Sequence, residues 1–317
     1  MPAAPTPTQL VEAAAGGDRA AVAKLLSIVE RGGAAAHEAG RATFARSGSA
    51  YTVGITGAPG AGKSTLTSSV VAHARADGER LAVLAIDPSS PYTGGAILGD
   101  RVRMSEHALD DGVFIRSMAT RGHLGGLALA TPEAVRVLDA AGFAWVLIET
   151  VGVGQVEVEV AGAADTTVVV VNPGWGDNVQ AAKAGLMEIA DVFVVNKADR
   201  TGAEQTAHDL ESMMDLTDTG AWRPPVVRTV GTTGDGAGDL WAAVADHRRH
   251  LESTDELAER RRARLRGELD LIVEHRLRAR AMELLGTAGR AEVDAQVASG
   301  RLDPWTAADQ VLAPLNA

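Results

Sequence analysis

The sequence of 317 residues contains no cysteine, and aromatic residues make up only 3% of it. The lack of cysteine excludes disulfide bonds, cysteine-ligated zinc sites and iron–sulfur clusters. Because aromatic side chains are so few, alanine, valine and leucine must fill the core of any fold. No apolar run approaches the roughly 18 residues of a membrane-spanning helix, and the proline-rich residues 1–8 lack the charged start of a secretory signal. These absences predict a soluble, cytoplasmic protein.

Basic residues are also in the minority, with 30 Lys and Arg against 41 Asp and Glu and a net charge of −11. So acidic a chain is repelled by nucleic acids and by anionic membrane surfaces, and we expect neither as a partner. Hydrophobic residues make up 46% of the chain, which is enough for the core of one large domain or two small ones.

The rest of the chain is organised around one glycine-rich stretch. It reads G-x-x-x-x-G-K-S, the phosphate-binding loop (P-loop) of nucleoside triphosphatases, and is formed by Gly57, Ala58, Pro59, Gly60, Ala61, Gly62, Lys63, Ser64 and Thr65. The β-branched run 51–56 before it predicts a buried strand, and residues 64–76 after it predict a helix. Backbone N–H groups of the turn and the positive helix end would bind polyphosphate. Lys63 would reach the β- and γ-phosphates, and the Ser64 hydroxyl would bind Mg²⁺.

Further buried strands are predicted along the chain, at residues 81–86, 113–117, 144–148, 166–171, 192–195 and 226–230. Runs of Val, Ile and Leu that alternate with helical segments are typical of a mostly parallel sheet covered by helices on both faces. The sequence therefore predicts an α/β fold of the P-loop NTPase type. Such sheets bind ligands at the carboxyl ends of their strands. Four residues directly follow predicted strands and should lie at that edge: Gly57, Asp87, Glu149 and Asn196.

Helical segments flank this core, so we predict three domains: an N-terminal helical cap (1–48), the nucleotide-binding core (49–250) and a C-terminal helical arm (251–317). In the cap, Asp18 is expected to begin a helix that runs to about residue 30. In the core, Thr131 and Pro132 have the pattern of a helix start.

The arm is predicted to begin with a long helix, because Ser253 and Glu256 have the spacing of a capping box. Apolar residues then recur at helical spacing, namely Leu257, Leu265, Leu269, Ile272, Val273, Leu277, Leu284 and Leu285. An exposed apolar stripe of this length predicts a dimerisation arm. Arginines at 260–266 are interleaved with acidic residues, which favours a solvated, ion-paired face over a nucleic-acid site.

A second motif selects the base of the nucleotide. Residues Asn196, Lys197, Ala198 and Asp199 read N-K-x-D at a strand end. Asp199 would accept two hydrogen bonds, from guanine N1–H and from the 2-amino group, and adenine lacks both donors. Asn196 would support the base edge and the Lys197 stem would lie over the ring. Downstream of a P-loop, this motif predicts GTP rather than ATP.

Carboxylates at the same edge point to a bound metal. Glu149, Thr150, Val151 and Gly152 occupy the place where GTPases have D-x-x-G, an acid for Mg²⁺ and a glycine for the γ-phosphate, with Glu in place of Asp. Asp87 and Asp100 lie in loops aimed at this edge. Because Mg²⁺ takes only one or two carboxylates directly, the three acids cannot all be ligands, and which of them binds the ion stays open.

The water-orienting glutamine of small signalling GTPases is absent from its usual place. It directly follows the D-x-x-G glycine, where this chain has Val153, and Gln155 lies two residues further on. This predicts slow intrinsic hydrolysis that a partner must complete.

Taken together, the motifs resemble the methylmalonyl-CoA mutase-associated GTPases, the MeaB/ArgK/MMAA family. The resemblance rests on Gly57–Thr65, Asp87–Ser90, Gly94–Asp100, Glu149–Gln155 and Asn196–Asp199, and it extends over nearly the whole chain. It implies a homodimeric GTPase that serves as chaperone of an adenosylcobalamin-dependent mutase, by default methylmalonyl-CoA mutase. Such a protein gates cofactor delivery and protects or rescues the mutase, with GTP/GDP and Mg²⁺ as cofactors.

The resemblance also implies roles for individual residues. The residues with an implied catalytic role are Lys63, Asp100, Glu149 and Gln155. Whether Gln155 orients the attacking water stays open. Contacts to Mg²⁺ fall to Ser64, Asp87, Asp100 and Glu149. A guanine-side loop is formed by Val230, Gly231 and Thr232, where Ser-Ala-x is expected. Switch residues that couple the nucleotide to the mutase are Gly152, Gly154, Gly174, Asp177 and Lys183.

Other functions remain as alternatives. A metallochaperone GTPase needs Cys and His clusters, and the chain has no cysteine. A P-loop kinase would need a phosphate-acceptor site, which no motif indicates. A non-catalytic GTP-dependent scaffold would bind GTP without hydrolysing it.

Overall fold

The protein is described by a computed structural model that covers residues 4–87, 105–107, 109–119, 126–150, 160, 162–174, 188–216 and 220–316. Within these residues seven strands form one parallel sheet: β1 (Tyr51–Gly57), β2 (Leu81–Asp87), β3 (Val113–Ala119), β4 (Trp145–Thr150), β5 (Thr166–Val171), β6 (Val192–Asn196) and β7 (Val226–Thr229). Their order in the sheet is β3-β2-β4-β1-β5-β6-β7. The α/β fold of the P-loop NTPase type predicted from the strand pattern is confirmed.

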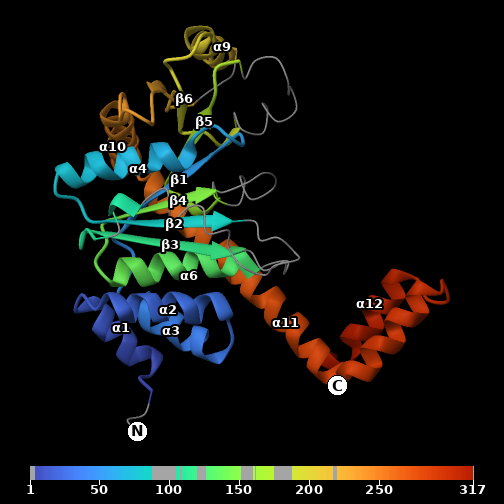
Figure 1. Ribbon diagram of the computed structural model, residues 1–317. Helices are drawn as coiled ribbons and strands as arrows, with labels where there is room; N and C mark the ends of the chain where they lie inside the picture. The colour runs from blue at the N-terminus through green and yellow to red at the C-terminus, as the bar shows by residue number, and fades with distance from the viewer. Residues whose placement is uncertain are drawn as a thin grey trace. The chain divides into compact units, whose positions relative to one another are not determined.

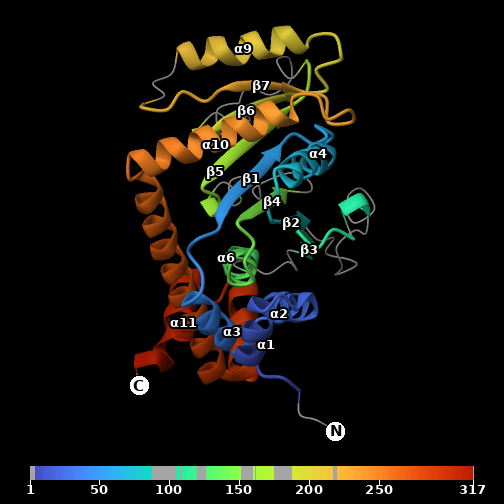
Figure 2. The ribbon, with the colours of Figure 1, turned by 90° about the vertical axis from the view of Figure 1, so that its left-hand side faces the viewer.

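Helices cover both faces of the sheet (Figure 1). The described helices are α1 (Pro7–Ala15), α2 (Arg19–Arg31), α3 (Ala34–Phe44), α4 (Lys63–Ala76), η1 (Ser105–His107), α6 (Gly126–Ala140), α9 (Ala203–Asp215), α10 (Ala237–Ser253), α11 (Glu256–Ala298), α12 (Pro304–Leu312) and η3 (Ala313–Asn316). One face carries α4 and α10, and the other carries α6, with α1–α3 packed outside it. Figure 2 shows α9 beside β6 and β7 at one end of the sheet.

Alternate side chains of each strand serve the two faces. Along β4, Trp145 and Leu147 pack with α4 and α10, whereas Val146 and Ile148 pack with α6 and the cap. All four are at most 5% exposed. This burial on both faces explains why the strands are continuously apolar rather than alternating in polarity.

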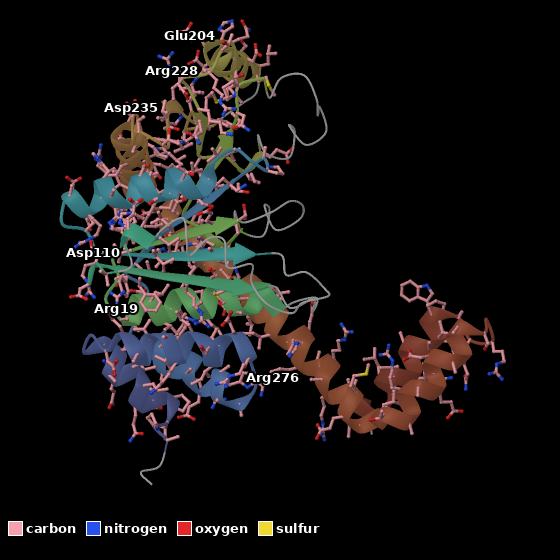
Figure 3. The ribbon with its side chains drawn as sticks, in the orientation of Figure 1. Arg19, Asp110, Glu204, Arg228, Asp235 and Arg276 are labelled. Atoms are coloured by element: carbon pink, nitrogen blue, oxygen red, sulfur yellow. The ribbon has the colours of Figure 1, made fainter. Side chains whose placement is uncertain are left out.

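The N-terminal cap packs on the core through apolar and polar contacts. As predicted, Asp18 is the N-cap of α2, where its carboxylate accepts from the backbone N–H groups of Ala20 and Ala21. The next residue, Arg19, donates to the Asp110 carbonyl oxygen at 3.3 Å and to the Val113 carbonyl oxygen at 2.7 Å. Figure 3 shows Arg19 reaching toward Asp110. The cap is thereby tied to the start of β3.

Two predicted helix starts were wrong. Helix α6 begins at Gly126 and contains Pro132 in its interior, so neither Thr131 nor Pro132 marks its start. Ser253 does not begin a helix either: it ends α10, where its hydroxyl donates to the His250 carbonyl oxygen at 2.8 Å. Helix α11 starts at Glu256 instead.

The chain divides into two compact units, one up to Arg264 and one from Leu265 to Ala317. Helix α11 runs across this division and is interrupted at Gly286, whose φ is 71°. In the second unit the apolar stripe predicted from the sequence is exposed, with Leu269 at 58% and Leu277 at 51%. No helix within the described residues has the length and apolar character needed to cross a membrane.

The first turns of α11 are held by two buried carboxylates at the amino-terminal edge of the sheet. Arg261 donates from Nη2 to Asp165 Oδ2 at 2.7 Å and from Nε to Asp165 Oδ1 at 3.1 Å, and Arg264 also donates to Asp165. Arg260 donates to both carboxylate oxygens of Asp191, at 3.0 and 3.2 Å. Asp165 and Asp191 immediately precede β5 and β6, so α11 begins on the opposite edge from the P-loop.

The neighbouring arginines determine the direction in which the pKa of Asp165 is shifted. Burial by itself would raise the pKa of this carboxyl, but the hydrogen bonds and charges of Arg261 and Arg264 outweigh burial and hold its pKa below the ordinary value. At Asp191 burial outweighs the charge and hydrogen bonds of Arg260 and the hydrogen bond from the Thr167 N–H, and the pKa is raised. Asp165 therefore receives hydrogen bonds from two arginines of α11, whereas Asp191 receives them from Arg260 alone among the arginines of α11.

We expect Arg261→Met to lower the free energy of unfolding at pH 7 by about 2 kcal/mol, because the buried Asp165 carboxylate loses two hydrogen bonds and a positive charge. A lowered folded-state pKa stabilises the protein above the ordinary carboxyl pKa of 3.8, and this stability is lost as the pH falls through the folded value. The difference from wild type should thus shrink below about pH 4. Urea unfolding measures both effects, with the exposed Arg276→Met as control. Equal stability at pH 7 would contradict the argument.

Candidate functional site

The P-loop lies at the carboxyl edge of the sheet, between β1 and the N-terminus of α4. Strand β1 is flanked by β4, which brings Glu149 beside Ile55, and by β5, which brings Val170 beside Gly57. Strand β6 ends in Asn196 at the same edge. The parallel sheet therefore gathers at one edge the motifs that the sequence spreads over about 140 residues.

Two glycines of the loop are required by their surroundings. Gly57 has a φ of 132°, and a Cβ there would lie 2.0 Å from the Val170 carbonyl oxygen. Gly62 has a φ of 87°, and a Cβ there would lie 2.5 Å from Asn196 Nδ2. Only glycine accepts both the left-handed backbone and the close approach.

Gly57→Ala is expected to destabilise the protein by about 2 kcal/mol, because the new methyl group would collide with the backbone of β5. Thermal unfolding measures this loss. Gly78→Ala is the matched control: its φ is 84°, but nothing lies within 4 Å of the new Cβ, so it reports backbone strain alone. An equal loss in both variants would show that the collision with β5 contributes nothing.

Lys63 is the first residue of α4 and is 7% exposed. Its ammonium group donates to the Gly57 carbonyl oxygen at 2.7 Å and to the Ala58 carbonyl oxygen at 3.3 Å. The positive charge is therefore held over the loop, beside the N-terminal N–H groups of α4. Both features attract an anion to the same point.

Ser64, the residue after Lys63, contacts Glu149 at the end of β4. The Ser64 hydroxyl donates to Glu149 Oε1 at 2.5 Å, and the two residues are 7% and 1% exposed. A hydroxyl and a carboxylate oxygen so close together are ligands suited to a hard cation such as Mg²⁺. These residues therefore fit the predicted metal, and water and phosphate oxygens would supply its other ligands.

Asn196 joins the P-loop to the guanine-side loop. Its Nδ2 donates to the Ala61 carbonyl oxygen at 2.7 Å, and its Oδ1 accepts from Thr229 Oγ1 at 3.1 Å and from Gly231 N–H at 3.0 Å. Both polar atoms of the side chain are thus hydrogen-bonded, and the residue is 2% exposed. Asn196 therefore joins the two loops through hydrogen bonds, and its role at the base edge stays a prediction.

Lys197 and Asp199 follow on the surface of the site. Lys197 has a left-handed backbone, with φ at 59°, and its ammonium group donates to the Gly60 carbonyl oxygen at 2.6 Å. Its stem thus crosses beside the P-loop, where it could cover a base. Asp199 is exposed, so its carboxylate is accessible to a ligand.

The predicted site residues divide into those that the structure describes and those that it does not. Lys63, Ser64, Glu149 and Asn196 are brought together at one edge, and Gly174 lies after β5, where its N–H donates to Thr206 Oγ1 at 3.1 Å. In the guanine-side loop, Gly231 is buried and Thr232 exposed. Several predictions lie outside the described residues, namely Asp100, Gly152, Gly154, Gln155, Asp177, Lys183 and the side chain of Asp87.

Sequence reasoning missed residues that hold the site together. Thr229 is 1% exposed and pairs in register with Asn196, to which its hydroxyl donates. Ser69 of α4 donates to the Gly231 carbonyl oxygen at 2.7 Å. A hydroxyl at the last position of a strand could have signalled Thr229, but nothing in a helical serine signals its partner.

Comparisons with known proteins agree with this geometry. The model of the family "Methylmalonyl Co-A mutase-associated GTPase MeaB" matches residues 22–285. A Pyrococcus abyssi protein named as a GTPase is 48% identical over 308 residues, 96% of this chain and 95% of that protein. The mouse methylmalonic aciduria type A homolog, a mitochondrial protein, is 35% identical over 268 residues, 83% of this chain and 65% of that one.

A solved structure shares the fold. The crystal structure of an LAO/AO transport system kinase superposes with a TM-score of 0.73 and covers 100% of both chains, at 24% sequence identity. At this identity the likeness shows the fold alone.

Proposed function

Because the chain belongs to the family of methylmalonyl-CoA mutase-associated GTPases and is therefore a GTPase, we propose that it is a cytoplasmic GTP-hydrolysing chaperone of an adenosylcobalamin-dependent mutase. Methylmalonyl-CoA mutase is the proposed client, and GTP hydrolysis is coupled to cofactor loading and to protection or reactivation of the mutase. The choice of this mutase as partner rests on the description of the family, which names it.

The observation that carries the nucleotide part is the set of hydrogen bonds around Asn196. Its amide donates to the P-loop and accepts from the guanine-side loop, at 2.7 and 3.0 Å. These contacts join the proposed phosphate-binding and base-binding halves of the site. A connection of this kind supports recognition of the whole nucleotide rather than of phosphate alone.

In this proposal each residue acts on a different part of the nucleotide. Lys63 stabilises the charge that develops on the transferred γ-phosphoryl group, and the N–H groups of the P-loop orient it. Asp199 accepts from guanine N1–H and the 2-amino group. Ser64 and Glu149 would hold Mg²⁺, which when bound neutralises charge on the phosphate oxygens. Asp87 and Asp100 are proposed as further carboxylates of the metal side, and Gln155 as a residue near the attacking water.

Slow intrinsic hydrolysis is part of the proposal, since Val153 stands where a small GTPase has glutamine. The client mutase would complete the site. We also propose that Gly152, Gly154, Gly174, Asp177 and Lys183 form the switch that transmits the nucleotide state to the client.

Dimerisation is assigned to the C-terminal arm (251–317), with residues 1–48 as the cap and 49–250 as the core. The support is the exposed apolar stripe of α11, on which Leu265, Leu269, Val273, Leu277 and Leu284 are each at least 42% exposed. A surface this apolar is typical of an interface, and a second copy of the chain would cover it.

The testing experiment is the GTP turnover of the purified protein, alone and with methylmalonyl-CoA mutase from the same organism. A low basal rate that rises many-fold with the mutase would support both the partner and the missing-glutamine argument. A high basal rate that the mutase leaves unchanged would contradict both. Tight GTP binding without hydrolysis under either condition would favour a scaffold, and phosphate transfer to a metabolite would favour a kinase.

A further inference from the structure

An asparagine that belongs to none of the motifs lies at the same edge of the sheet as the P-loop. Asn172 directly follows β5, and its Oδ1 atom is buried without a hydrogen-bond partner among the residues that the structure describes. A buried acceptor without a partner costs free energy, so such atoms are rare and usually have a reason. At the edge where a ligand is proposed to bind, the reason to examine first is a donor that pairs with Oδ1 during binding.

The position of Asn172 follows from the strand register. Strand β5 runs between β1, which ends in the P-loop residue Gly57, and β6, which ends in Asn196. The register pairs Val171 with Val195, so the next pair along these two strands is Asn172 with Asn196. Asn172 therefore lies between the phosphate-binding loop and the N-K-x-D motif.

The alternation of side chains along β5 gives the face of the sheet to which Asn172 belongs. Val170 packs in the core with α4, whereas Val169 and Val171 pack in the core with α9. The residue before a proline is held in an extended conformation, and Pro173 follows Asn172. The alternation therefore continues through Asn172 and assigns it to the face of Val170, on which the P-loop leads into α4.

Few donors are available to Oδ1 at this place. Phosphate oxygens are themselves acceptors, and the N–H groups of guanine are assigned to the aspartate of the N-K-x-D motif. The metal side is excluded, because Ser64 meets Glu149 at β4, which lies across β1 from β5. Lys63 already donates to the carbonyl oxygens of Gly57 and Ala58. The remaining candidate is the second ammonium group of the site.

That ammonium group belongs to Lys197, which directly follows β6. Within the described residues it makes one hydrogen bond, to the Gly60 carbonyl oxygen at 2.6 Å. An ammonium group has three N–H donors, so two remain for other acceptors. The stem passes close to the P-loop, since a Cβ at Gly62 would lie 3.8 Å from Lys197 Cε. A buried acceptor at Asn172 and spare donors at Lys197 thus follow the ends of neighbouring strands.

We infer that Asn172 is a positioning residue for the nucleotide, whose Oδ1 accepts from the Lys197 ammonium group and so holds the Lys197 stem over the guanine ring. The inference deepens the proposed function and rests on it. A lysine side chain loses much rotamer freedom when it is ordered. Held at both Gly60 and Asn172, the stem is ordered before the base arrives, and this preorganisation strengthens binding.

The test is a double-mutant cycle of Asn172→Ala and Lys197→Met. Its readout is the Kd of GDP, which carries the same base as GTP and is not hydrolysed. Asn172→Ala should raise this Kd about tenfold, the scale of a hydrogen bond to a charged group. In the Lys197→Met background the same substitution should raise Kd less than about twofold, because the donor is gone. An equal effect in both backgrounds, or no effect in the wild-type background, would overturn the inference.

Further measurements separate positioning from a general loss of folding. At saturating GTP, Asn172→Ala should keep the wild-type kcat, because Lys197 acts on the base and not on the phosphate. Its melting temperature without nucleotide should stay close to that of wild type, since Oδ1 makes no hydrogen bond within the described residues. Gln205→Ala removes an exposed amide of α9 and is the control that should leave Kd unchanged. Absence of guanine-nucleotide binding in the wild-type protein would instead contradict the proposed function itself.

Discussion

Lys63→Ala should lower the rate of GTP hydrolysis by about 1,000-fold, the largest effect we expect from any single substitution. The Lys63 ammonium group lies over the P-loop, 2.7 Å from the Gly57 carbonyl oxygen, and is 7% exposed. It is therefore placed to stabilise negative charge on the transferred phosphoryl group in surroundings that water screens poorly. Single-turnover hydrolysis of GTP, with and without the mutase, measures the loss.

The control for this variant is Lys24→Ala, which removes the same charge from the exposed face of α2. Its turnover should match that of wild type, because an exposed charge far from the loop is screened by salt. Thermal unfolding checks that both variants are folded. A Lys63→Ala protein that retains a tenth or more of the wild-type rate would remove Lys63 from the catalytic role.

Asp199→Asn should change the nucleotide that the protein prefers, with a shift of about 1,000-fold from GTP toward XTP. A carboxylate accepts from both guanine N1–H and the 2-amino group. An amide offers one acceptor and one donor, so it matches xanthine, which has a carbonyl oxygen in place of the 2-amino group. Asp199 is exposed beside the P-loop, where a base can reach it.

Competition binding of GTP and XTP to wild type and variant measures this shift. Glu204→Gln is the matched control, since it neutralises a carboxylate on α9 that is 91% exposed. That variant should keep the preference for GTP. If Asp199→Asn also kept it, guanine would have to be read by other groups, and the interpretation of the N-K-x-D motif would be wrong.

The elements that sequence patterns predicted well are those whose residues are constrained locally. Strand β5 was predicted with its observed bounds, Thr166–Val171, because a parallel strand buried on both faces needs a continuous apolar run. The family suggested by the motifs was confirmed by the family match. Helix starts were predicted less well: Pro132 lies inside α6, and the Ser253 hydroxyl binds the His250 carbonyl oxygen at the end of α10 instead of beginning α11.

Site residues followed the same division. Gly57 and Gly62 of the P-loop were predictable, because a left-handed backbone with no space for a Cβ requires glycine and so appears directly in the sequence. The contacts of Ser69 and Thr229 were not, because each depends on a partner distant in the chain, Gly231 for Ser69 and Asn196 for Thr229.

The sequence by itself determined which chemical groups this protein has: a glycine turn that can approach phosphate, a lysine, a hydroxyl and carboxylates of the types that bind phosphate and metal, and the N-K-x-D aspartate, which we propose to bind guanine. These are properties of residue type and short spacing. Only the tertiary structure decided how the groups are held, through Asn196 between two loops and through Ser69 of α4. The physical reason is that hydrogen bonds act over about 3 Å, and only folding brings residues far apart in the chain within that distance.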